Sequence, residues 1–198
     1  MSPGRALDIG AAAGGNTRVL LDRGWDAIAL EYSEDGSRMA RERGVPVVRA
    51  DALILPLPDA CLDLVVAYDV LEHIEDDDRA VQELCRVLRP GATALIAVPA
   101  DPRLWSAHDE AVGHYRRYTR TTLLPLLERN GMEVADVESW NVLLRPVVKW
   151  HRRSSTGSDQ ERMSPVVNFG LRAIIATERF LPVKSRAGVS LLVRAQRR

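Results

Sequence analysis

The chain of 198 residues has little cysteine, no net charge and no long apolar run. Its two cysteines, Cys61 and Cys85, have no metal-type spacing, which favours a reduced cytoplasmic protein over a disulfide-bonded secreted one. The 27 basic and 27 acidic side chains cancel, so we expect no nucleic-acid partner. No apolar stretch reaches the length that crosses a bilayer, and we expect no transmembrane segment.

Strand and helix signals alternate along the chain, which favours a mostly parallel sheet covered on both faces. Strands are expected at 6–9, 27–32, 45–50, 62–68, 93–99, 132–140 and 188–195. Helices are expected at 17–23, 33–43, 76–88, 121–130 and 164–181, with a mobile loop at 152–161. A chain of this length and pattern fits one α/β unit.

The most informative segment is Leu7-Asp8-Ile9-Gly10-Ala11-Ala12-Ala13-Gly14, where an apolar strand passes through a glycine-bearing turn into a helix. Glycines let the backbone approach a ligand, and the N–H groups at a helix start attract negative charge. A dinucleotide site uses G-x-G-x-x-G around a pyrophosphate, which the Asp8 carboxylate would repel. Asp8 suits an ammonium group instead. S-adenosylmethionine carries one, beside a carboxylate and a sulfonium.

Further motifs follow in order: Glu31 ending the second strand, Ala50-Asp51-Ala52, Leu55-Pro56-Leu57-Pro58, Leu62-Asp63-Leu64-Val65, Val70-Leu71-Glu72-His73 and Arg86-Val87-Leu88-Arg89-Pro90-Gly91. From Leu7 to about Val134 the chain resembles the class I S-adenosylmethionine-dependent methyltransferases, in the small-molecule branch called type 11. The resemblance implies an α/β, doubly wound Rossmann-like sheet of seven strands, mostly parallel with the last strand antiparallel. It implies a single domain over 1–198, with a cofactor-binding half at 1–100 and a substrate-facing half with lid-like insertions at 101–198.

Two features depart from the family pattern. Ala12 replaces the middle glycine of the loop, which is tolerable where the backbone has a negative φ. The chain also starts almost at the first strand, without the N-terminal helices that relatives carry. We therefore expect an open pocket, a lid formed by the later insertions, or a true start upstream of Met1.

The family pattern also implies which residues contact the cofactor. Glu31 lies 23 positions after Asp8, near the offset at which a strand-end acid meets a ribose diol. Asp51 resembles the acid that accepts a hydrogen bond from the adenine amino group, with local capping as the alternative. The full expected set is Asp8, Gly10, Ala12, Gly14, Glu31, Tyr32, Asp51, Ala52, Tyr68 and Asp69.

The segment 105–119 is rich in aromatic and donor groups and is expected to face the substrate through Trp105, Tyr115, Arg116 and Tyr118. Arg116 and Arg117 both suit a carboxylate or phosphate. The alternative is that Arg117 and Tyr118 only hold the segment to the domain. We favour one arginine in each role.

Three histidines, His73, His108 and His114, are candidates for the general base because imidazole titrates near neutrality. We expect no metal. The alternative, implied by methyltransferases with an acid-x-x-Glu-His segment, is a divalent ion on Asp69, Glu72, His73 and His108, with His114 as a further ligand candidate.

The sequence therefore predicts methyl transfer from S-adenosylmethionine to a small-molecule acceptor, foremost at oxygen, with nitrogen and carbon as alternatives. A catalytically weak cofactor-binding partner subunit is the second hypothesis. A nicotinamide-dependent oxidoreductase is the third, disfavoured by Asp8 and by the lack of a Tyr-x-x-x-Lys pair. A homodimer is a further expectation. The helix at 164–181 is expected to pack on the sheet, with a lipid channel, dimer contact or membrane contact as alternatives.

Overall fold

The computed structural model describes residues 2–154, 171, 174–178 and 180–198. A seven-stranded sheet runs through it in the order β3-β2-β1-β4-β5-β7-β6. Strand β7 (Ser190–Arg197) pairs antiparallel with both β5 and β6, and the other strands are parallel to one another. The predicted fold class, with its antiparallel last strand, is confirmed.

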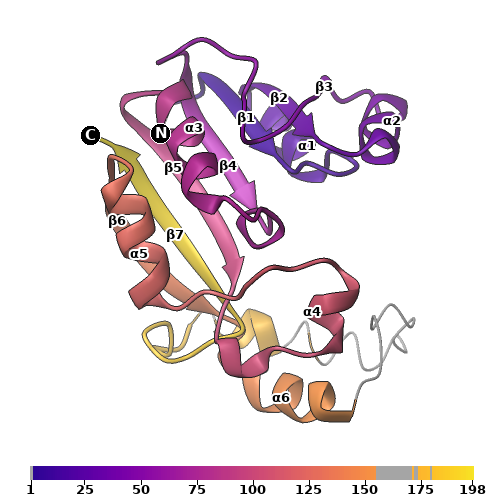
Figure 1. The fold of residues 1–198 in the computed structure, drawn as a ribbon, viewed down its shortest axis with the longest axis vertical. Coiled ribbons are helices and arrows are strands. Elements are labelled where there is room, and N and C mark those ends of the chain that lie inside the picture. Colours follow the sequence, from indigo (N-terminus) through magenta and orange to yellow (C-terminus); the bar gives the residue numbers. More distant parts are fainter. Residues whose placement is uncertain (1, 155–170, 172–173, 179) are drawn as a thin grey trace.

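The remaining strands are β1 (Arg5–Ile9), β2 (Asp26–Glu31), β3 (Val47–Arg49), β4 (Leu62–Tyr68), β5 (Leu88–Pro99) and β6 (Met132–Trp140). The helices are α1 (Gly15–Asp22), α2 (Glu34–Glu42), α3 (Asp77–Val87), α4 (Ala107–Ala111), α5 (Arg120–Arg129) and α6 (Arg145–Ser154), with short 3-10 turns η1 (Leu71–His73) and η2 (Pro102–Leu104). Figure 1 shows α3 and α5 side by side in front of the sheet, and α1 and α2 at its β1–β3 end.

Two strand boundaries differ from the prediction. Strand β3 is shorter than expected because Pro46 has no N–H to give to the ladder. Strand β5 begins at Leu88, which pairs with Leu62, but regular pairing resumes only at Thr93. The residues between them bulge out of the ladder, and Gly91 allows this because its φ is 77°.

The segment after β6 differs from the prediction more than these strand boundaries do. Helix α6 was not predicted; its Pro146 lies in the first turn, where proline is tolerated. The predicted loop at 152–161 begins inside α6 and otherwise lies outside the described residues. Most of the predicted helix at 164–181 also lies outside them, although 174–178 are helical. Within the described ranges, every helix falls short of the length and apolar character needed to cross a membrane.

The alternation of β1 decides which side chains reach which face of the sheet. Leu7 and Ile9 are each 1% exposed and join the main core with Leu84 of α3. Ala6 belongs to a smaller cluster against α1 on the other face. Asp8 shares that second face, and this explains why its carboxylate lies beside α1.

Candidate active site

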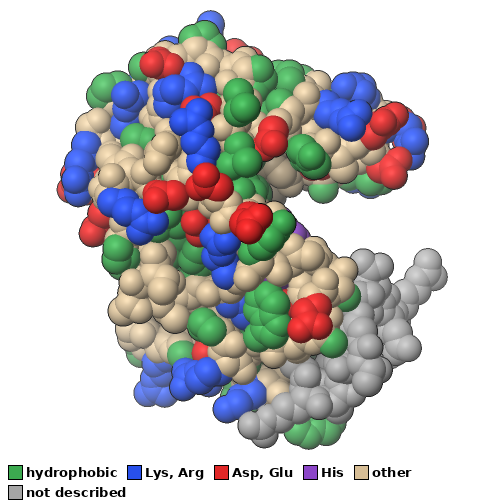
Figure 2. Space-filling model, in the orientation of Figure 1, with side chains coloured by type: hydrophobic (Ala, Val, Ile, Leu, Met, Phe, Trp, Pro, Cys, Tyr) green, Lys and Arg blue, Asp and Glu red, His purple; other side chains and the backbone are tan. Residues whose placement is uncertain are grey.

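A large cavity, about 780 Å³, lies at the carboxyl ends of β1, β2 and β4, and we call it the edge cleft. Parallel sheets bind ligands at this edge, where successive loops diverge. Figure 2 shows that the molecule is deeply hollowed on this side. Six of the expected cofactor residues line the edge cleft: Gly10, Glu31, Tyr32, Asp51, Ala52 and Asp69.

The turn after β1 comes close to the segment that follows β4. Gly10 has a φ of 67°, and a Cβ on it would lie 2.6 Å from Val70 Cγ2. Only glycine satisfies both constraints without strain. Ala12 has a φ of 45°, so the condition under which alanine is tolerated here, a negative φ, is not met. The Ala12 backbone N–H donates to Glu31 Oε2 at 2.8 Å, and this hydrogen bond holds the residue in that conformation.

The Gly10 geometry predicts a large local effect of a single methyl group. Gly10→Ala should weaken S-adenosylhomocysteine binding about tenfold or more, because the strain at such a position costs on the order of 1–3 kcal/mol. Calorimetric titration measures this. Gly15→Ala is the matched control, since nothing lies within 4 Å of its added Cβ. Adding Val70→Ala should restore part of the Gly10→Ala loss, and no recovery would contradict the contact.

Glu31 organises the rim of the edge cleft. Its Oε1 accepts hydrogen bonds from the Ser33 N–H at 2.8 Å and the Ser33 hydroxyl at 2.7 Å, while Oε2 accepts from Ala12. The carboxylate is 9% exposed and lines the cleft. A carboxylate offers about four acceptor positions, so Glu31 retains acceptor capacity for a ligand that donates hydrogen bonds.

Asp8 lies beneath the turn and is absent from the residues that line the edge cleft. It is 1% exposed, and its Oδ2 accepts a hydrogen bond from the Thr17 hydroxyl at 2.6 Å. Its Oδ1 is buried without a hydrogen-bond partner among the described residues. Burial raises the pKa of Asp8, although the Thr17 hydrogen bonds oppose this. A buried carboxylate oxygen of this kind is costly unless a cation compensates it.

Only some of the other cofactor candidates line the edge cleft. Asp51 lines the edge cleft, and its Oδ1 also accepts from the Leu53 N–H at 2.9 Å, which is the capping contact considered above. Tyr68 borders a separate hollow over β5 and β7. Gly14 caps the N-terminus of α1 with a φ of 77° and does not line the cleft.

A second cavity of about 310 Å³ adjoins the edge cleft, and we call it the histidine cavity. Its polar lining is Asp69, Glu72, His73, His108, His114, Arg117 and Ser190. Asp69 and His73 line both cavities, so they form the wall between them. The fold thus gathers all three histidines that the sequence singled out as candidate bases.

Asp109, which the sequence analysis missed, holds the histidine cavity together. It is 0% exposed and pairs with Arg117 at 2.7 Å. The same Oδ1 lies 2.9 Å from His114 Nδ1, while Oδ2 accepts from the Ser106 N–H at 3.0 Å. Because a carboxylate only accepts, the His114 proton is assigned to Nδ1. The only sequence signal was the capping pattern Ser106-x-x-Asp109.

Glu72 lies at the floor of the histidine cavity. The residue is 0% exposed, and neither carboxylate oxygen has a hydrogen-bond partner among the described residues. Burial raises the pKa of Glu72 to about 8, and the charges of Asp69 and Asp109 act in the same direction. Burial and the neighbouring His114 lower the pKa of His73, which keeps its ring neutral near pH 7.

The expected substrate residues have different surroundings. Tyr115 lines the edge cleft and is 55% exposed. Arg116 pairs with Asp77 at 2.7 Å, and Tyr118 is 2% exposed with its hydroxyl donating to Asp77 at 2.8 Å. Trp105 is partly exposed, with its ring N–H directed at Glu110. In this structure both Arg117 and Tyr118 hold the segment to the domain.

The sheet order, the antiparallel β7 and a ligand cleft with a strand-end acid define the fold of class I S-adenosylmethionine-dependent methyltransferases. Residues 7–96 match the methyltransferase domain family. The cofactor of the class, and of this chain, is S-adenosylmethionine.

Known proteins agree with this placement. A probable S-adenosylmethionine-dependent methyltransferase of Mycolicibacterium smegmatis is 34% identical over 134 residues, covering 66% of this chain and 52% of the relative. The chain thus spans about half of that relative's length. An uncharacterized methyltransferase of Bacillus subtilis is 29% identical, covering 80% of this chain and 68% of the relative.

Solved structures show the same fold. The [4+2]-cyclase SpnF superimposes with a TM-score of 0.68 at 25% identity, over 100% of this chain and 76% of SpnF. A methyltransferase from Archaeoglobus fulgidus gives a TM-score of 0.68 at 20% identity, over 99% of this chain and 87% of that structure.

Proposed function

We propose that this chain transfers the methyl group of S-adenosylmethionine to a hydroxyl oxygen of a small-molecule acceptor. The bound cofactor supplies an electrophilic methyl group, and the chain supplies binding and orientation. The single observation that carries the oxygen assignment is the histidine cavity, which joins the edge cleft at His73 and Asp69.

The edge cleft fits the cofactor by the chemistry of its lining. Glu31 would accept a hydrogen bond from a ribose hydroxyl, and Asp51 would accept from the adenine amino group. The turn at Gly10 permits close approach of the methionyl part. Asp8 would supply negative charge beneath that turn, and its unpartnered Oδ1 supports this role.

The histidine cavity fits a polar acceptor. A hydroxyl both donates and accepts hydrogen bonds, and imidazole and carboxylate groups surround this space. Methylation of an alcohol also requires loss of its proton, for which these groups are suited acceptors. Tyr115, exposed at the cleft, would contact the rest of the acceptor. A nucleic acid acceptor is not proposed, because the chain has no net positive charge.

A substitution of His73 tests the assignment of oxygen as the acceptor atom. Replacing His73 with glutamine should lower kcat about 100-fold, because the acceptor hydroxyl loses an imidazole contact at the wall between the cavities. Affinity for S-adenosylhomocysteine should stay within about threefold. The measurement is transfer of isotopically labelled methyl groups to hydroxyl acceptors and to amine analogues of the same shape. Labelled product from the amines alone would refute the oxygen assignment.

Cofactor binding without methyl transfer is a second candidate function, favoured by the likeness to a protein described as a [4+2]-cyclase. The same labelling experiment separates the two. Cofactor binding with no labelled product from any hydroxyl, amine or carbon acceptor would select the second candidate. We also propose a reducing compartment such as the cytoplasm, because both Cys61 and Cys85 are free thiols.

A further inference from the structure

A cavity of about 280 Å³ lies where β5 and β6 end and β7 begins, and we call it the basic cavity. Three arginines from separate segments line it: Arg103 of η2, Arg120 at the start of α5 and Arg186 of the loop before β7. Asp101 is the only carboxylate among its described lining residues. Cationic side chains thus outnumber anionic ones around this space, and an anionic ligand would balance the difference.

Asp101 does not balance all three arginines. Its Oδ1 accepts a hydrogen bond from Arg103 Nε at 2.9 Å, and its Oδ2 accepts one from Arg145 Nε at 3.1 Å. One carboxylate therefore already pairs with two guanidinium groups. Arg120 and Arg186 have no carboxylate partner among the described residues. The uncompensated positive charge of the basic cavity belongs to these two side chains.

Arg120 is held in place by neutral acceptors. Its Nη1 donates to the Val137 carbonyl oxygen at 3.1 Å, and its Nη2 donates to the Lys184 carbonyl oxygen at 3.1 Å. The Nη2 also donates to the Ser139 hydroxyl at 3.5 Å. These contacts orient the guanidinium without cancelling its charge, and they use three of its five N–H donors. The two remaining donors are available to a ligand, and little rotamer freedom would be lost on binding.

We propose that the basic cavity binds the phosphate group of a small molecule. A phosphate monoester carries a charge of about −1.5 to −2 near neutral pH and three strong acceptor oxygens. Arg120 and Arg186 would each donate to these oxygens, in the geometry that arginine commonly adopts with phosphate. Thr121 and Ser185 add hydroxyl donors to the same lining. A carboxylate, with one negative charge and two oxygens, would leave part of the charge and some donors unused.

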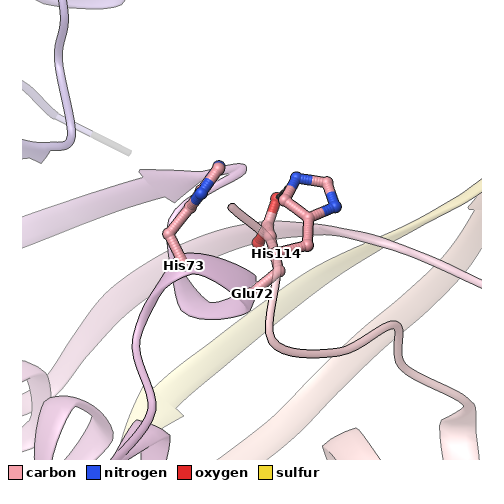
Figure 3. A group of neighbouring side chains, drawn as sticks. All are labelled: Glu72, His73 and His114. Atoms are coloured by element: carbon pink, nitrogen blue, oxygen red, sulfur yellow. Dashed lines mark ion pairs between the residues drawn. The ribbon is translucent and has the colours of Figure 1, made fainter. Parts of the chain in front are cut away.

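The basic cavity is separate from the edge cleft and from the histidine cavity, because it shares no described lining residue with either. The side chains drawn in Figure 3 all line the histidine cavity: Glu72, His73 and His114. Arg117 and Ser190 also line the histidine cavity, whereas their chain neighbours Tyr118 and Leu191 line the basic cavity. The same segments thus separate the two spaces. The phosphate compound is therefore a second ligand, and this inference does not depend on the proposed function.

Calorimetric titration of the full chain with phenyl phosphate, inorganic phosphate and benzoate, all at one ionic strength, tests the site. Phenyl phosphate should bind saturably at one site, and about tenfold or more tightly than benzoate. Inorganic phosphate distinguishes the sources of the group: equal affinity would identify the free ion as the ligand, and weaker affinity a phosphate monoester. Saturation with S-adenosylhomocysteine, which would occupy the edge cleft, should leave the affinity for phenyl phosphate unchanged.

Two variants locate the binding. Arg186→Gln should weaken phenyl phosphate binding about tenfold, and Arg120→Gln about tenfold to 100-fold, because each removes charge-assisted hydrogen bonds. Arg186 is exposed, so its replacement leaves the fold intact. Circular dichroism verifies the fold of Arg120→Gln, which also loses its contacts to carbonyl oxygens. Arg129→Gln is the matched control, because it removes one positive charge from the other end of α5, and affinity should stay within about twofold.

Four outcomes would overturn the site. The first is the absence of saturable phenyl phosphate binding. The second is an equal loss of affinity in Arg129→Gln and Arg186→Gln, which would mean that nonspecific charge attracts the anion. The third is benzoate binding as tight as that of phenyl phosphate, which would reject the phosphate assignment. The fourth is loss of phenyl phosphate binding once S-adenosylhomocysteine is bound, which would place the phosphate in the edge cleft.

Discussion

Replacing Arg117 with methionine lowers the free energy of unfolding by about 3–5 kcal/mol, because removing one partner leaves a buried charge uncompensated. The Arg117 side chain is 1% exposed and pairs with Asp109, which is fully buried. Its Nη1 also donates to the Ala100 carbonyl oxygen at 3.1 Å. Methionine keeps the apolar stem and removes the donors. Urea denaturation followed by circular dichroism measures the loss.

Two comparisons isolate the buried charge. Arg38→Met removes an exposed pair with Asp35, whose side chain is 77% exposed, and should leave stability nearly unchanged. Adding Asp109→Asn to Arg117→Met should recover part of the loss, since it neutralises the orphaned carboxylate. A loss for Arg117→Met below about 1 kcal/mol, the range of surface pairs, would contradict the buried pairing.

Glu31→Ala lowers the affinity for S-adenosylhomocysteine by about 10-fold to 10²-fold, because a hydrogen bond to a charged group contributes about 1.5–3 kcal/mol and Glu31 has about one acceptor position left for a ribose hydroxyl. The substitution also releases the Ala12 N–H that the carboxylate holds at 2.8 Å. Isothermal titration calorimetry gives the affinity directly. Stability should fall less than binding, since the Glu31 side chain lies at the rim of the edge cleft.

Glu34→Ala is the matched control for Glu31. Glu34 starts α2 three residues later, but its side chain is 79% exposed and pairs with Arg49 at 3.3 Å. It does not line the edge cleft, so its removal should leave the affinity unchanged. Equal losses in both variants would mean that nonspecific charge, rather than contact with the ribose, governs binding.

Most of the fold could be predicted from the sequence because its signals are local. The apolar β4 and the Asp76 cap of α3 stand in consecutive residues, and their boundaries matched closely. The inserted, antiparallel β7 came from the family resemblance, since periodicity carries no information on strand order. Helix α6 was not predicted, although the proline in its first turn, Pro146, is compatible with a helix.

The site was predictable only in part. Glu31 and Gly10 were found because strand ends and glycine turns have fixed places in a parallel sheet. Glu72 and His114 were grouped only as candidate ligands in the metal alternative that the resemblance implies. Their contact itself depends on a backbone hydrogen bond between Tyr115 and η1, far apart in sequence. Asp109 was not predicted, because a sequence does not distinguish an acid that only caps a helix from a buried acid that pairs with several side chains.

Titration of the full chain with S-adenosylhomocysteine and, separately, with NADH tests the central claim most directly. In the proposed function, Asp8, Glu31 and the Gly10 turn would hold an aminoacyl nucleoside rather than a pyrophosphate. We predict saturable, one-to-one binding of S-adenosylhomocysteine that Glu31→Ala weakens about tenfold or more, and no binding of NADH. Binding of NADH without any binding of S-adenosylhomocysteine would contradict the account.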